Sequence, residues 1–443
     1  MPTTGLSNAA AVAGGALVAA GALGFAGHKG QLAAAGLAGL IALVVVLARG
    51  ATFSLCLALT VSALVPIDYV EGARLGVFSP ALLLVAGVAL AHLRRLRLSL
   101  LDTAFVALVL ASTVGAPKLS SALGWTFALI VGWVLPSCLE PGTWDVRALL
   151  NRWVTLASGL AVFAIVERFV LAANPLFGGL YAGAPVPVTQ IWATYRATTT
   201  LGHPLLNGSF FATATAIAVA QWLGGHRRNG LRLGALCGLG VIASGSRSSL
   251  ISAAVAVVLV LVLTKAEGVS PGRRMRLVLI TSFAGLVVLS SGLVRSGEET
   301  ASSAQIHRSV LENSRSLLEI ARPFGDGPGL TVSHLKVLGT DSLLESYWLE
   351  AAISLGVLAM VVMLLKTLLA AGSALRLANA PAFAGLVALA FNVTVFKPFT
   401  GHPFVTLWLG LLIAAARLPY ASPSDSEELE SSAGLPKERV ATS

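Results

Sequence analysis

Long, uninterrupted apolar runs are the feature that most constrains how this chain can fold. About fourteen of them occur, and within them apolar residues do not alternate with polar ones. A helix needs about 20 apolar residues to cross a bilayer core, whereas a membrane β-strand shows a two-residue alternation. Only 11% of the 443 residues are charged, against about 25% in soluble proteins. The runs therefore predict an all-α polytopic membrane protein.

We expect about 12–14 transmembrane helices in a single domain over residues 1–420, because several runs are short for a bilayer. Residues 421–443 are polar and rich in Ser and Glu, which predicts a disordered cytoplasmic tail. The N-terminus lacks the basic region of a secretory signal, so its first run is expected to be a retained span. The runs lie near 9–27, 31–48, 51–67, 77–93, 103–117, 121–139, 153–173, 208–223, 231–244, 248–264, 277–294, 346–365, 382–396 and 404–417.

Basic residues between the runs predict the orientation, because short cytoplasmic loops are enriched in Lys and Arg. With fourteen spans, the basic clusters at 94–97, 227–232 and 265–276 fall on one side, together with both termini. We expect that side to be the cytoplasm. The net charge of +10 comes without a basic block interleaved with aromatic residues, so no nucleic-acid partner is expected.

Two long loops, at 174–207 and 295–345, then fall on the outer side, and both carry arginines. This breaks the positive-inside trend, and an anionic ligand on that face would explain it. In the second loop, apolar residues recur at helical spacing over 304–321, which predicts a short amphipathic outer helix. The stretch "RPFGDGPG" follows it and predicts a tight turn.

Arg247 stands in the middle of the apolar stretch 237–263, where a guanidinium in hydrocarbon would cost at least ~2.5–3.5 kcal/mol. Its neighbours in "SGSRSS" are small, so a turn at the outer surface would remove this cost. There Ser246 and Ser248 and a helix N-terminus would favour a bound anion. The alternative is an arginine that only caps a turn and extends to the membrane surface.

Other polar residues near the outer face have a functional and a structural interpretation each. Arg196 precedes His203 by seven residues, and it is either an anion ligand or an anchor at the membrane interface. Arg308 lies on the expected outer helix, where a solvated face is the alternative. Asp341 lies where the second loop re-enters the membrane, and it is either a helix N-cap or a general base.

In their order along the chain, these stretches resemble the O-antigen ligase and O-antigen polymerase superfamily of bacterial membrane glycosyltransferases. The resemblance covers about residues 190–360. It rests on "YRATTTLGHPLLNG", on "SGSRSSL", on "HRSVLENSRSLLEIARPFGDGPG" with Arg308 fifteen residues before Pro323, and on "TDSLLESYWLEAAISLG". Two departures stand out. The asparagine after His-Pro is missing, although Asn207 lies three residues further on, and Asp341 replaces a family histidine.

The resemblance implies a fold of glycosyltransferase C type that needs no metal and no cofactor. Its donor would be a glycan on a polyprenyl pyrophosphate, and its acceptor a glycan or a lipid-linked hydroxyl. Arginines would stabilise the pyrophosphate leaving group while a base deprotonates the acceptor in an inverting transfer. The catalytic residues expected are Arg247, Arg308 and Asp341. Substrate-binding residues expected are Arg196, His203, Arg315, Ser246 and Ser248, and reserve bases are His203, His307, His334 and His402.

This interpretation places the protein in the bacterial inner (plasma) membrane, among membrane lipids, with its active site facing outward. The residues do not separate a polymerase from a ligase. A transporter or flippase for a lipid-linked or anionic precursor is the main alternative, although transporters usually put polar groups at the bilayer midplane. A non-catalytic scaffold would explain the spans but would leave the outer arginines without a reason.

Overall fold

The computed structural model describes residues 28–65, 79–177, 195–264, 270–290, 308, 322–329, 346–395 and 403–420. Within these ranges the regular structure is helical, apart from one isolated bridge between Leu96 and Leu139. Three of the described helices are long and apolar enough to cross a membrane: Val44–Leu64, Val146–Leu171 and Val357–Arg376. The expectation of an all-α membrane protein is thus supported at the level of fold class. The expected tail at 421–443 lies outside the described residues.

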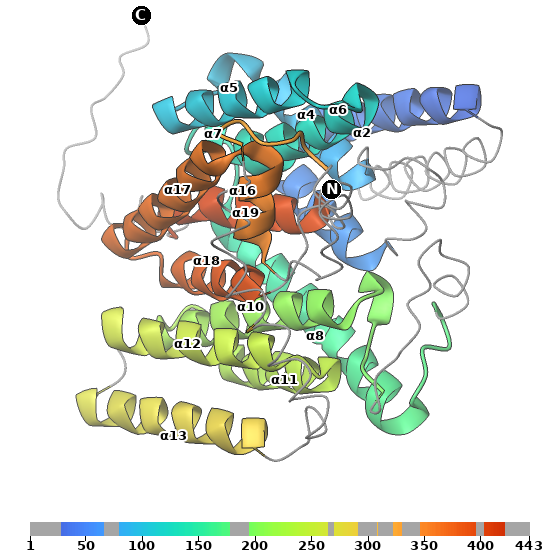
Figure 1. Ribbon diagram of the computed structural model, residues 1–443. Helices are drawn as coiled ribbons and strands as arrows, with labels where there is room; N and C mark the ends of the chain where they lie inside the picture. The colour runs from blue at the N-terminus through green and yellow to red at the C-terminus, as the bar shows by residue number, and fades with distance from the viewer. Residues whose placement is uncertain are drawn as a thin grey trace, which may run out of the picture.

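The helices form three groups that lie side by side (Figure 1). Helices α16 to α19 lie between a group formed by α4 to α7 and a group formed by α8 to α13, with α13 at the outer edge. Their bounds are α2 His28–Leu64, α4 Pro80–Ala91, α5 Leu100–Val114, α6 Leu119–Leu129, α7 Leu135–Cys138, α8 Val146–Val166, α10 Pro204–Leu223, α11 Gly230–Ser244, α12 Arg247–Leu263, α13 Pro271–Ser290, α16 Tyr347–Leu355, α17 Val357–Arg376, α18 Ala380–Asn392 and α19 Pro403–Ala416.

Helix α19 lies at the centre, and every one of its residues is buried. A helix that is apolar on all sides belongs inside a bundle. Gly410 of α19 packs directly on the carbonyl oxygen of Gly132, where a Cβ would find no room. Small residues of this kind allow membrane helices to approach closely. Trp408 lies against Phe210 of α10, with ring centroids 5.0 Å apart and ring planes tilted by 45°.

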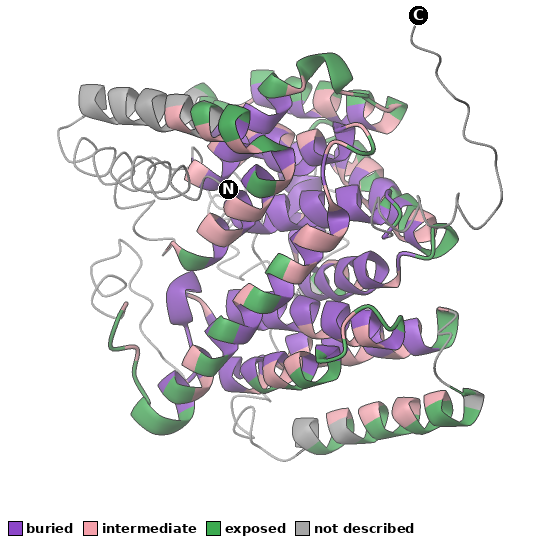
Figure 2. Ribbon diagram, turned by 180° about the vertical axis from the view of Figure 1, so that it is seen from behind, coloured by how far each residue is buried: buried purple, intermediate pink, exposed green. Residues whose placement is uncertain are grey.

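The outside of the bundle is apolar. Exposed residues are frequent on α5, α13 and α17, and none of the described side chains on α13 is buried (Figure 2). Large exposed side chains include Leu100, Val114, Phe283 and Leu368. Soluble monomers rarely expose contiguous apolar surface on this scale. An apolar solvent such as the hydrocarbon of a bilayer accounts for it.

One of the expected runs differs from the observed helices. The runs at 31–48 and 51–67 share the label α2, but Gly50, with φ +77°, is not helical and separates two helices at a kink, as the two runs predict. The run at 346–365 is not one continuous helix, because α16 ends at Leu355 and α17 begins at Val357. Between them Gly356 adopts φ 95° and ψ 154°. A positive φ of this size is strained for residues with a side chain, so the position favours glycine.

The stretch "RPFGDGPG" forms the expected turn, and its backbone N–H groups donate hydrogen bonds to the end of α16 beside Gly356. The N–H of Asp326 donates to the carbonyl of Ile353 at 3.1 Å, and the N–H of Gly327 donates to the carbonyl of Ser354 at 3.0 Å. These carbonyls would otherwise lie at a helix end without partners. The turn at 322–329 therefore caps α16 and stabilises the break.

Contacts between distant segments define two ends of the bundle. At one end, called here the Arg97 end, the backbone N–H of Arg97 donates to the carbonyl of Cys138, the guanidinium of Arg227 donates to the hydroxyl of Thr155, and that of Arg273 lies over Trp222. The three basic clusters of the sequence thus lie at the same end of the helices, as the orientation argument requires. The opposite end, called the Arg247 end, holds Glu167, Arg196 and the turn between α11 and α12.

Candidate functional site

The turn at Gly245 and Ser246 splits the apolar stretch 237–263 into two helices, as predicted. Gly245 ends α11 in the left-handed region with φ +66°, and Ser246 is the N-cap of α12. The hydroxyl of Ser246 accepts a hydrogen bond from the N–H of Ser249 at 3.2 Å and lies 3.2 Å from the hydroxyl of Ser248. Arg247 is the first residue of α12, so its cation lies at the end of the helices.

Arg196 lies directly over this turn. The N–H of Ala197 donates to the carbonyl of Ala243 at 3.1 Å, which fixes the segment beside the end of α11. A Cβ on Gly245 would lie 2.9 Å from Cδ of Arg196, so the glycine serves both the left-handed φ and the close approach. Arg196 is only 2% exposed, which argues against the membrane-interface anchor. The fold brings Arg196 and the Arg247 turn together.

His203 begins α10 at the same place. Its Nδ1 accepts a hydrogen bond from the N–H of Leu205 at 3.2 Å, so it acts as the N-cap. Burial and the positive charge of Arg196 lower the pKa of His203 to about 4. The ring is therefore neutral at pH 7, and because Nδ1 is the acceptor, its proton lies on Nε2. One turn further along α10, Gly208 packs closely on Ser246 and Ser249.

Glu167 and Arg168 hold the two segments that carry the arginines of the site: residues 195–199 and the end of α11. Glu167 is fully buried at the end of the long helix that starts with α8, where the backbone turns into a π-helix, Glu167–Leu171. Its carboxylate accepts hydrogen bonds from the hydroxyl of Tyr195 at 2.7 Å and from the N–H groups of Thr198 and Thr199 at 2.7 and 3.0 Å. π-Helical turns of this kind often occur at functional sites.

Arg168 donates to the carbonyls of Ile242 and Ala243, the latter at 3.2 Å. It thereby satisfies carbonyls at the C-terminal end of α11, just before the turn that carries Arg247. Glu167 holds the segment of Arg196 and Arg168 holds the end of α11, so two adjacent residues fix the geometry of both arginines. The sequence contained this signal as an acid–base doublet at the end of an apolar run.

Asn207 completes the support of the Arg196 segment. Its amide donates to the carbonyl of Ala197 at 2.9 Å, and its oxygen accepts a hydrogen bond from the hydroxyl of Thr199 at 2.6 Å. Thr199 has φ +43°, a strained conformation for a β-branched residue, and Asn207 helps to hold it there. Asn207 is thus a structural residue in the first turn of α10.

Beside the turn, Nε of Arg247 and Oδ1 of Asn392 are buried and have no hydrogen-bond partner among the described residues. Asn392 ends α18, and its amide nitrogen donates to the hydroxyl of Ser249 at 2.8 Å. Buried polar groups are nearly always satisfied, so an unpaired donor and an unpaired acceptor at one turn mark a candidate position for a polar ligand or an ordered water. An anion would suit the arginine, and a hydroxyl would suit Asn392.

Of the other predicted site residues, the structure describes only Arg308. Arg308 is in helical conformation and exposed, which agrees with the solvated face as well as with a ligand contact. The positions that lie outside the described residues are Arg315, Asp341, His307, His334 and His402. Within the described part of the chain, no group of three or more His, Cys, Asp or Glu side chains could hold a metal ion.

A second buried charged group lies at the Arg97 end, and the sequence analysis missed it. Nζ of Lys366, in the middle of α17, donates to the carboxylate of Asp102 and to the hydroxyl of Ser137 at 2.7 Å. The ammonium also lies 4.6 Å from the ring centroid of Trp133. The other carboxylate oxygen of Asp102 accepts a hydrogen bond from the hydroxyl of Ser99 at 2.6 Å. Lys366 lies one residue beyond the run expected at 346–365, because α17 extends past that run to Arg376.

Comparison of the sequence with protein-family models and with curated proteins finds no match. The functional argument therefore rests on the residues of this chain and on their geometry.

Proposed function

We propose that this protein is an inverting, metal-independent glycosyltransferase that moves a glycan from a polyprenyl pyrophosphate to an acceptor hydroxyl. The observation that carries the proposal is the Arg247 turn. It combines an arginine with an unpartnered buried Nε, a helix N-terminus, two serine hydroxyls and the adjacent Arg196. Pyrophosphate carries its charge on oxygens that guanidinium groups bind in bidentate fashion.

The chemistry asks for charge stabilisation on one side of the sugar and a base on the other. The acceptor oxygen attacks the anomeric carbon as the bond from that carbon to the pyrophosphate oxygen breaks, which inverts the configuration. Arg247, with Arg196 and Arg308, would stabilise the charge that develops on the leaving pyrophosphate. Asp341 would take the proton of the acceptor hydroxyl. The products are the elongated glycan and the lipid pyrophosphate.

The geometry of His203 suits a donor better than a base. Its Nδ1 is occupied by the N–H of Leu205, and its pKa of about 4 makes the free ring a weak base. A neutral imidazole with its proton on Nε2 is a hydrogen-bond donor, and this is the role that a phosphate or sugar oxygen would use. We therefore narrow its role to substrate binding, with Ser246 and Ser248, and keep Asp341 as the base.

The resemblance to O-antigen ligases and polymerases supplies the substrate class. We also propose an orientation in the membrane. The Arg247 end would face the outside of a bacterial plasma membrane, and the Arg97 end with both termini would face the cytoplasm. Three basic clusters gathered at the Arg97 end support this assignment, because the positive-inside rule favours it. Polymerase and ligase differ in the acceptor, and both are compatible with the site.

A transporter or flippase is the second candidate, and one observation favours it. Lys366 and Asp102 form a buried ion pair inside the helices, and ionisable residues within membranes often mark transport pathways. However, the pair is closed by Ser99, Ser137 and Trp133, as a structural element would be. We therefore rank glycosyl transfer first.

The test uses the purified full-length protein with a polyprenyl-pyrophosphate glycan and an acceptor, and product length is measured. Arg247→Ala should lower turnover by about 10²–10³-fold, the usual effect of removing one charge-stabilising donor. Arg308→Ala should lower turnover to a similar extent. Arg228→Ala is the matched control, because it removes an exposed arginine at the Arg97 end.

Unchanged turnover in both Arg247→Ala and Arg308→Ala would refute the site. Movement of the lipid across a vesicle membrane without a new glycosidic bond would favour the transporter instead. Either variant must first be shown to elute as the wild type does on size exclusion, so that a loss of folding is not scored as a loss of catalysis.

A further inference from the structure

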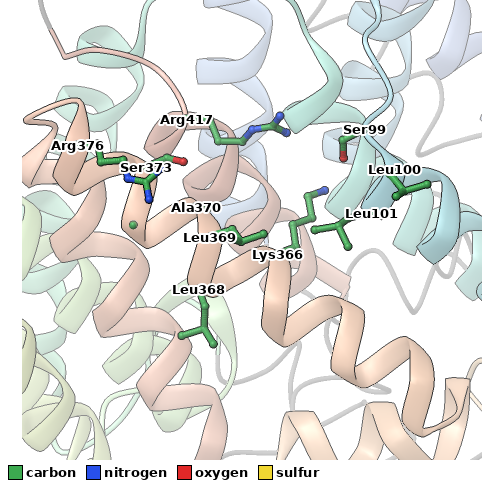
Figure 3. A pocket seen from close by; sticks show the side chains of 11 residues that line it. Ser99, Leu100, Leu101, Lys366, Leu368, Leu369, Ala370, Ser373, Arg376 and Arg417 are labelled. Atoms are coloured by element: carbon green, nitrogen blue, oxygen red, sulfur yellow. The ribbon is translucent and has the colours of Figure 1, made fainter.

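A cavity of about 420 Å³ lies at the Arg97 end, between the start of α5, the second half of α17 and Arg417. Its lining includes three basic side chains, Lys366, Arg376 and Arg417, and no acidic one. Figure 3 shows Lys366 and Arg417 extending toward Ser99 and Leu101, while Arg376 lies near Ser373. The site described above does not use this cavity, which lies at the opposite end of the bundle.

The charge of the cavity is positive on balance. Lys366 is compensated by Asp102, but the exposed Arg376 and Arg417 form no ion pair within the described part of the chain. Arg417 keeps its place by donating to the carbonyl of Ser137 at 3.2 Å, which leaves its other N–H groups available. Two guanidinium groups on the rim of one cavity suit a phosphate oxygen group.

The apolar part of the lining indicates that the phosphate belongs to an amphiphile. Leu100, Leu368 and Leu369 line the same cavity and are 84%, 68% and 54% exposed, which makes them part of the apolar outer surface. Arg376 ends a helix long enough to cross a membrane, so it lies at the depth of lipid headgroups. At a rise of 1.5 Å per residue, the two leucines of α17 lie roughly 10–12 Å deeper, among the acyl chains.

We propose that this cavity binds an anionic phospholipid, with its headgroup at the basic residues Arg376 and Arg417 and its acyl chains along Leu368, Leu369 and Leu100. Basic pockets between membrane helices recognise such headgroups. The proposal does not depend on glycosyl transfer, because it concerns the other end of the bundle and its readout is lipid binding.

The test measures binding of phosphatidylglycerol and of phosphatidylcholine to the full-length protein in detergent by native mass spectrometry. The wild type should retain phosphatidylglycerol preferentially. Arg376→Ala and Arg417→Ala should each weaken its binding about five-fold, and the double variant more, since each basic residue contributes separately to attraction of an anionic lipid. Arg228→Ala/Arg232→Ala is the control, with the same loss of charge from exposed arginines outside the cavity.

Three results would overturn the proposal. They are equal retention of phosphatidylcholine by the wild type, unchanged phosphatidylglycerol binding by the double variant, and displacement of the lipid by an equal concentration of glycerol 3-phosphate. The last would mean that the cavity selects a soluble phosphate. If Arg417→Ala fails to fold because its bond to Ser137 is lost, Arg376→Ala alone decides, because no described hydrogen bond of the fold involves its side chain.

Discussion

The two ends of the bundle hold buried charge in different ways. At the Arg97 end, the ammonium of Lys366 faces the carboxylate of Asp102, so the two charges cancel. At the Arg247 end, Glu167 is held by N–H and hydroxyl donors and Arg168 by carbonyls, with Arg196 and Arg247 close by. Neutral dipoles satisfy a charged group without cancelling it. The first arrangement is self-contained, whereas the second places Arg168, Arg196 and Arg247 near one carboxylate, and under the proposed function these arginines would attract an anionic substrate.

Breaking the cancelled pair should give the largest effect on stability. Lys366→Met leaves the carboxylate of Asp102 buried without its counter-ion, and we expect a loss of about 3–5 kcal/mol in the free energy of unfolding. Lys366→Met/Asp102→Asn should recover most of this, because asparagine is neutral and can still accept from Ser99. Chemical denaturation in detergent measures both variants.

The double variant Lys366→Met/Asp102→Asn also tests whether the protein is a transporter. If Lys366 is structural, the double variant should form product at nearly the wild-type rate per folded molecule. A double variant that is as stable as the wild type but inactive would show that the pair works in function, and the two ends would then not differ as described.

What the sequence could predict depended on how local the signal was. The turn at Gly245 was predictable, because small residues and one arginine interrupt an apolar run within six positions, "SGSRSS". Lys366 was not, because a single lysine in an apolar run says nothing of its partner, and Asp102 lies 264 positions away. The break at Gly356 was hidden as well, since glycine is common in membrane helices.

The break at Gly356 and the hydrogen bonds to Glu167 could not be predicted, for the same reason. Both depend on hydrogen bonds from a segment distant in sequence: the turn at 322–329 donates to α16, and residues 195–199 donate to Glu167. Periodicity describes one helix at a time, so it cannot show which loop returns to which helix end. The order of motifs along the chain predicted that Arg196, His203 and the Arg247 turn lie together, but not the residues that hold them in place.

Glu167→Gln probes how the Arg247 end holds its charge. A glutamine that keeps its oxygen toward Tyr195 and Thr198 must turn its NH₂ group toward the N–H of Thr199, so that two donors face each other. We expect a loss of about 2–3 kcal/mol in the free energy of unfolding, the value of a hydrogen bond to a buried charged group. Thermal denaturation followed by intrinsic fluorescence measures it.

The same variant should displace Arg196, because its segment is anchored by Glu167. Tyr195→Phe is the matched control: it removes one hydrogen bond to the carboxylate and leaves the backbone donors in place. We expect it to cost about 1 kcal/mol and to leave product formation largely intact. Equal effects of the two variants would mean that the backbone contacts of Glu167 do not fix the site.

His203 gives the smallest effect, and it appears only at acidic pH. Because the folded pKa of about 4 lies below the ordinary value of 6.5, the unfolded chain binds a proton more readily than the folded one. Stability should therefore be constant above about pH 6.5 and fall as the pH decreases from 6.5 toward 4. His203→Ser keeps an N-cap acceptor for Leu205 but cannot titrate. Its thermal midpoint should match the wild type within a few degrees at pH 7.5 and exceed it at pH 5. An equal decrease in both proteins between these pH values would place the sensitivity elsewhere and would leave the neutral, donating imidazole at the Arg247 end without support.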